Sequence, residues 1–211
     1  MNTAALREQI QLAHQHEDRT GQLIRQLEQQ LPHLHPTIRL PAQDAQGVLA
    51  RFVGAYIDHV PDLLDAANAV AREAGIESQI KPVLKIAEDY FLHPPKIMEG
   101  HVGLDSLLDE AYLAHRLVEE VNDLYIRHFA QQLIPLDTTT ANLIAHQLIG
   151  EQFANELDAV VHHSVDNMLS DESFALESVE QYRAALASPS TTDAWRRWPC
   201  LSQQLGVELG L

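Results

Sequence analysis

The sequence is poor in cysteine and in long apolar runs, and each shortage excludes a class of protein. A single cysteine, Cys200, rules out internal disulfides, so we expect a protein of a reducing compartment, the cytoplasm. No apolar run reaches the length of a membrane span, so we expect no membrane association. The opening MNTAALREQIQ also lacks the apolar core of a secretion signal.

Basic residues are scarce as well, since 14 Lys and Arg face 30 Asp and Glu, for a formal net charge of -16. Such a chain repels phosphate backbones, so nucleic acid is not an expected partner. Histidine, by contrast, occurs 12 times. Histidine-rich stretches can bind metal, although exposed pairs are commonly inert.

Hydrophobic periodicity indicates helices along the whole chain, with no alternating strand pattern and no internal repeat. We expect helices over residues 3–31, 43–74, 77–92 and 103–133, one from about 138 to 169, one ending near 187, and a short one from 193. Pro61 should kink or split the second of these helices. The pattern predicts an all-α, single-domain helical bundle over residues 1–211. Since no phosphate-binding, dinucleotide, zinc-ribbon or nucleophile-elbow motif occurs, whether the protein is an enzyme stays open.

The central helix, residues 103–133, carries two polar side chains in its apolar stripe. These are His115 and Asn122, whose spacing of seven places them on the same face as the leucines. A buried polar group costs free energy unless it finds a partner. The helix therefore either faces a polar cavity or holds these side chains satisfied within the core.

Four segments, taken in order, resemble the haem oxygenase-like family. RTGQLIRQLEQQLPHLHPTIRL is similar to its opening helix, VLARFVGAYIDHVPDLLDAA to its aromatic-rich second helix, and VLKIAEDYFLHPP to its short helix. LLDEAYLAHRLVEEVNDLYIRHF resembles the distal helix, with Tyr112-Leu113 at its Tyr-Val step. The resemblance covers residues 17–185, leaves 190–211 as a C-terminal extension, and implies a haem oxygenase-like bundle with an internal pocket.

The same resemblance bears on haem. In the family, a histidine on the first helix ligates the haem iron, and glycines on the distal helix admit the macrocycle. Here LEQQLP places Ile24 at the ligand position, while a shifted register makes His14 the candidate. Residues 115–121 contain no glycine, so bulky side chains fill the space of the macrocycle. We expect haem chemistry to be lost, with haem binding through His14 as an alternative.

A helical hairpin predicts a different site. A tight turn at 134–137 would make the central helix and its successor antiparallel neighbours, so that residues whose numbers sum to about 272 lie level. Carboxylates and imidazoles would then face one another, which is the ligand set that non-haem iron or manganese favours. The resemblance adds that several members of the wider fold use non-haem iron. The predicted metal ligands are His115, Glu119, Glu151, Asp158 and His162.

The remaining expectations concern the pocket and its alternatives. His59, Tyr112 and Asn122 are predicted to line a cavity for a small-molecule ligand, where an oxidation is one conceivable use. His146 is predicted to be structural, because the hairpin register separates it from His115. The alternative from another class is a non-catalytic acidic interaction module. In either case Trp195, Trp198 and the tail LGVELGL cover the core or pack on a second subunit as a homodimer.

Overall fold

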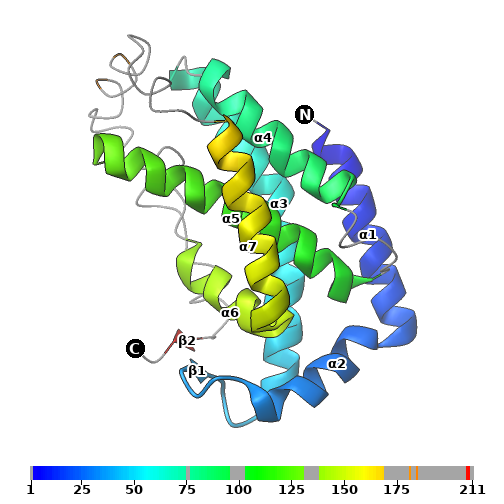
Figure 1. The fold of residues 1–211 in the computed structure, drawn as a ribbon. Coiled ribbons are helices and arrows are strands. Elements are labelled where there is room, and N and C mark those ends of the chain that lie inside the picture. The colour runs from blue at the N-terminus through cyan, green and yellow to red at the C-terminus, as the bar shows by residue number, and fades with distance from the viewer. Residues whose placement is uncertain are drawn as a thin grey trace.

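The all-α prediction is confirmed by the computed structural model, which describes residues 2–74, 77–95, 103–130, 138–168, 181, 184, 208 and 209. The helices described are α1 (Thr3–Thr20), α2 (Gln22–Gln30), the 3-10 turn η1 (Leu31–His33), α3 (Ala45–Ala74), α4 (Glu77–Leu92), α5 (Leu104–Phe129), α6 (Thr139–Ile149) and α7 (Glu151–Met168) (Figure 1). None of these helices is long and apolar enough to cross a membrane. The helices predicted to end near 187 and to begin at 193 lie outside the described residues.

The first predicted helix is in fact two, because Gly21 adopts the left-handed conformation, with φ 58°. Its N–H donates to the Glu17 carbonyl at 2.7 Å, which closes α1. The Glu17 carboxylate then accepts hydrogen bonds from the backbone N–H groups of Leu23 and Ile24, at 2.8 and 3.2 Å. A carboxylate at this point satisfies the free N–H groups of α2 and complements its dipole. One residue's backbone therefore turns the chain from α1 into α2 (Figure 1).

The helix predicted from about 138 to 169 is also two. Gly150 lies between α6 and α7 with φ 101°, a conformation that only glycine adopts readily. Its N–H donates to the His146 carbonyl and its carbonyl accepts from Ala154, at 3.0 and 2.9 Å. The break lets α6 and α7 pack against α5 at different places. Pro61, by contrast, lies inside helix α3, which is not split there, so of the two predicted alternatives, a kink or a split, the split is excluded.

Helix α5 is the centre of the bundle and packs against α1, α3, α4, α6 and α7 (Figure 1). Its side chains are buried around most of its circumference; Leu113, Leu117, Val118 and Val121 are all 0% exposed. Burying each such aliphatic side chain contributes roughly 1.5–3 kcal/mol. The described core is therefore organised around one helix, whose polar side chains must find partners inside the protein.

A short sheet was not predicted. Strand β1 (Ile38–Arg39) pairs antiparallel with β2 (Glu208–Leu209), with Ile38 opposite Leu209 and Arg39 opposite Glu208. Strands of two residues are too short to show an alternating pattern, which is why the sequence gives no sign of them. The pair lies at the α6 end of the bundle (Figure 1).

Candidate functional site

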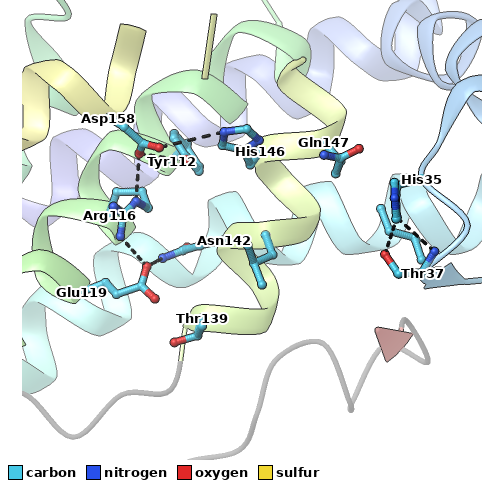
Figure 2. A pocket seen from close by; sticks show the side chains of 12 residues that line it. His35, Thr37, Tyr112, Arg116, Glu119, Thr139, Asn142, His146, Gln147 and Asp158 are labelled. Carbon is cyan, nitrogen blue, oxygen red and sulfur yellow. Dashed lines mark hydrogen bonds and ion pairs between the residues drawn. The ribbon is translucent and has the colours of Figure 1, made fainter. Parts of the chain in front are cut away.

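A cavity of about 540 Å³ opens between α5, α6 and α7 and the loop that contains β1 (Figure 2). Its lining residues are His35, Thr37, Ile38, Tyr112, Arg116, Glu119, Thr139, Asn142, Leu143, His146, Gln147 and Asp158. Most of these side chains are polar, which is unusual inside a helical bundle. Their contacts decide what the cavity can bind.

Arg116 lies at the centre of the polar wall. Its Nε donates to Asp158 Oδ1 at 2.9 Å and its Nη1 donates to Glu119 Oε2 at 2.7 Å. Nη2 lies 3.6 Å from Glu120 Oε2. Burial alone lowers the pKa of Arg116, but the hydrogen bonds and charges of Asp158 and Glu119 outweigh it and raise the pKa. The guanidinium therefore stays charged and joins α5 to α7.

Tyrosine and asparagine side chains extend this wall. Tyr112 OH donates to Asp158 Oδ1 at 2.9 Å, and Asn142 Nδ2 donates to Glu119 Oε2 at 2.6 Å. Behind them, the buried Tyr56 OH donates to Asn142 Oδ1 at 2.7 Å. Burial and the Asp158 charge raise the pKa of Tyr112, so its hydroxyl remains a neutral donor. A continuous chain of hydrogen bonds thus connects α3, α6, α5 and α7, and it holds the two carboxylates in place.

His146 lies beside Asp158, contrary to the prediction that it is remote from the site. Its Nε2 lies 3.2 Å from Asn155 Oδ1 and 4.0 Å from Asp158 Oδ2 (Figure 2). The ring also packs edge-on against Tyr112, with the two centroids 6.2 Å apart. The prediction assumed one straight helix through Gly150, whereas the break there brings α6 back toward α7. The glycine was the signal that could have revealed this residue.

The wall carries excess negative charge. Two carboxylates of the lining, Glu119 and Asp158, lie within ion-pair distance of its single guanidinium, Arg116, an excess of one negative charge. A third carboxylate, Glu120, lies 3.6 Å from Arg116 Nη2 but does not line the cavity. Nearby, burial and the charges of Glu119 and Glu120 raise the pKa of Asp123. The charges of Glu119 and Glu120 therefore act at this neighbouring position as well.

The predicted metal ligands are placed in different environments. His115 is fully buried and points toward α3, where its Nε2 donates to the Tyr56 carbonyl at 3.0 Å. Its ring lies parallel to that of His59, with the centroids 5.8 Å apart. Burial and the neighbouring His59 lower the pKa of His115 to about 3, so it is neutral. His115 is therefore satisfied in the core and does not line the cavity.

Of the other four, Glu119 and Asp158 come together, but the guanidinium of Arg116 lies between them. Glu151 is exposed, and exposed His162 pairs with Glu120 and Asp166 at 3.3 and 3.4 Å. Across the described residues, no group of three or more His, Cys, Asp or Glu side chains is positioned to hold a metal ion. The metal centre stays a prediction that rests on the sequence alone.

The remaining predicted site residues also lie in different places, and only one of them lines the cavity. Tyr112 lines the cavity, whereas half-buried His59 and buried Asn122 are not among its lining residues. Burial lowers the pKa of His59. His14 lies on the surface of α1, with its Nε2 2.8 Å from Asp58 Oδ1. A haem ligand at His14 would first have to leave that carboxylate.

No protein-family model matches the chain, and no curated protein or solved structure matches it significantly. The haem oxygenase-like resemblance therefore stays a prediction. The described fold and its cavity define an all-α protein with one acidic, hydrogen-bonded recess beside its central helix.

Proposed function

We propose that the protein binds a small organic cation in the cavity between α5, α6 and α7. The observation that carries the proposal is that two carboxylates of the cavity lining, Glu119 and Asp158, flank its single guanidinium, Arg116. A third carboxylate, Glu120, lies 3.6 Å from the same guanidinium without lining the cavity. In a partly buried site an uncompensated charge attracts its counter-charge more strongly than it would in water. A ligand cation would supply the positive charge that the chain itself does not.

The geometry supports a ligand of this class. The hydrogen bonds from Tyr112 and Arg116 to Asp158 both fall on Oδ1, while Oδ2 lies 4.0 Å from His146 Nε2. An ammonium group could therefore approach the Oδ2 side without breaking the bonds to Tyr112 and Arg116. An anion has the opposite difficulty, because the guanidinium is already bracketed by carboxylates.

The volume of the cavity and its apolar lining residues indicate the size and the apolar part of the ligand. A volume of about 540 Å³ is within the range of small-molecule sites. Ile38 and the half-exposed Leu143 offer apolar surface beside the acidic wall. A compact aromatic or aliphatic amine would match both features. Binding alone accounts for these contacts, so no reaction is assigned to the site.

Calorimetry with three matched probes tests the charge preference. Benzylamine, benzyl alcohol and benzoate share one ring and differ in charge at neutral pH. Benzylamine is expected to bind at least tenfold more tightly than the other two, and Asp158→Asn should remove most of that advantage. Asp166→Asn, at an exposed position on the same helix, is the matched control. Equal affinity for the three probes would refute the proposed cation preference.

A second pair of variants tests whether benzylamine binds in this cavity. Gln147 is an exposed residue of the cavity wall, so Gln147→Trp should fill the space and abolish benzylamine binding. Gln152→Trp adds the same side chain at an exposed position that does not line the cavity, and it should bind normally. Undiminished binding to Gln147→Trp would place the ligand elsewhere.

A further inference from the structure

The side chain of His146 can change its charge beside the acidic wall of the cavity. Its Nε2 lies 4.0 Å from Asp158 Oδ2, the carboxylate oxygen to which neither Tyr112 nor Arg116 donates (Figure 2). The same nitrogen lies 3.2 Å from Asn155 Oδ1. Because both neighbours are acceptor oxygens, the neutral ring carries its proton on Nε2 and takes up a second proton on Nδ1. Protonation therefore adds a positive charge within ion-pair distance of Asp158.

The other charges around this ring are one positive charge short of balance. Helix α6 packs against α5 and α7. Besides His146, the titratable side chains that line the cavity are His35, Tyr112, Arg116, Glu119 and Asp158. Tyr112 is neutral, because burial raises the pKa of its hydroxyl. Two carboxylates then face one guanidinium, so a single proton on the His146 ring would make the wall neutral.

The other imidazole of the lining, His35, belongs to a different wall. Its Nδ1 accepts from the Thr37 N–H at 3.3 Å and lies 2.7 Å from Thr37 Oγ1. Figure 2 shows this pair well apart from Asp158, on the far side of Gln147. A proton on His35 therefore lies farther from the acidic wall than a proton on His146, and it would compensate that wall less.

We propose that His146 is the internal counter-ion of Asp158, so that a proton on its ring and a ligand cation in the cavity exclude each other. The inference rests on the proposed function and adds a pH dependence to the same site. The two positive charges would compete for one carboxylate oxygen and would repel each other in a partly buried site, where charges interact more strongly than in water. Imidazoles exchange their protons between about pH 5 and 8, so the cavity would hold an amine at slightly alkaline pH and release it as the pH falls. By linkage, a bound amine disfavours protonation of His146 to the same extent.

Calorimetry with benzylamine at pH 8.0 and pH 5.5 tests this exclusion, because the amine itself stays charged throughout that range. Wild type is expected to bind at least tenfold more weakly at pH 5.5. Where the ring is half protonated, binding should release protons, which repeated titrations in buffers of different ionisation enthalpy measure. His146→Gln keeps a side-chain donor for Asn155 but cannot be protonated, so its affinity should change less than threefold between the two pH values. Equal pH dependence in His146→Gln and wild type would overturn the proposal.

His35→Gln is the matched control, because it removes the other imidazole of the lining and should keep the pH dependence of wild type. A pH dependence lost in His35→Gln and kept in His146→Gln would assign the exclusion to the wrong residue. Far-UV circular dichroism at both pH values shows whether each variant is folded.

Should His146→Gln fail to fold, the ring of the wild-type protein provides the test by nuclear magnetic resonance. Saturating benzylamine should lower the pH at which the His146 ring signals titrate, and an unchanged titration would overturn the proposal as well. If wild type binds no benzylamine at either pH, the proposed function fails and the exclusion fails with it. If it binds equally well at both, only the exclusion fails.

Discussion

Neighbouring residues on α5 have different roles, and of His115 and Arg116 only His115 was predicted to belong to a site. His115 is buried against α3 and donates to the Tyr56 carbonyl, whereas Arg116 reaches Asp158 on α7. Burial of His115 was predictable from the apolar stripe around it. The sequence left open whether its partner would be a cavity or the core, because a backbone carbonyl on another helix leaves no trace in a residue pattern.

His115→Leu is expected to leave stability at neutral pH within about 1 kcal/mol of wild type, because one hydrogen bond is lost while the orphan Nδ1 disappears. The effect of this substitution on folding stability appears at acidic pH. The folded-state pKa of about 3 lies below the unfolded value of 6.5, so the wild type loses stability as pH falls from 6.5 toward 3. That loss amounts to about 1.4 kcal/mol per pH unit, and His115→Leu should lack it. Urea unfolding from pH 4 to 7 measures the difference.

The matched control for this change is His163→Leu, at an exposed position on α7. It should keep the acid dependence of the wild type. Parallel stability curves for His115→Leu and wild type would show that position 115 is not the buried neutral imidazole described here.

Burial of Glu110 is expected to give the opposite dependence of folding stability on pH. It is 3% exposed, its Oε2 has no hydrogen-bond partner, and burial raises its pKa to about 8. Because the folded state keeps a proton that the unfolded state releases above 4.5, stability should fall as pH rises from 4.5 to 8. Glu110→Gln mimics the neutral acid, so it should resemble wild type at pH 4.5 and exceed it at pH 8 by on the order of a few kcal/mol. Denaturant unfolding at both pH values measures this, with exposed Glu156→Gln as control; no gain at pH 8 would contradict the burial of a protonated carboxyl.

At the scale of elements, two glycines decided what the sequence could and could not predict. Gly21 and Gly150 each end one helix and begin another with positive φ. A helical period continues across such a residue, so periodicity alone merges the two helices. The hairpin register nevertheless held for α7, since Asp158 contacts Tyr112 and Arg116 close to the predicted level. It failed for His146, which lies before the break.

Gly150→Ala is expected to destabilise the protein by about 1–3 kcal/mol, because φ 101° is strained for any residue with a Cβ. No atom lies within 4 Å of the added methyl, so the effect would come from the backbone alone.

Gly54→Ala is the informative control, since its Cβ would meet His14 Cε1 at an ordinary 3.5 Å. In the interior of α3 it should stabilise by roughly 0.5–1 kcal/mol. Chemical denaturation of both measures the contrast, and a neutral Gly150→Ala would argue against the described turn.

For the whole molecule, composition predicted the acidic character but not its distribution. A formal charge of -16 is spread along the sequence, and nothing in that number shows that three carboxylates gather around Arg116. The all-α fold followed from periodicity, which is a local property. The cavity depends on where α5, α6, α7 and the loop between η1 and α3 meet, and such long-range contacts are not encoded in any single segment.

Cation binding in the cavity is best tested by titrating isotope-labelled protein with benzylamine and following the nuclear magnetic resonance spectrum. Saturable shifts are expected for the Asn142 side-chain amide and the His146 ring, with the dissociation constant found by calorimetry. Shifts confined to residues outside the cavity, or no shifts at concentrations where calorimetry detects binding, would contradict it.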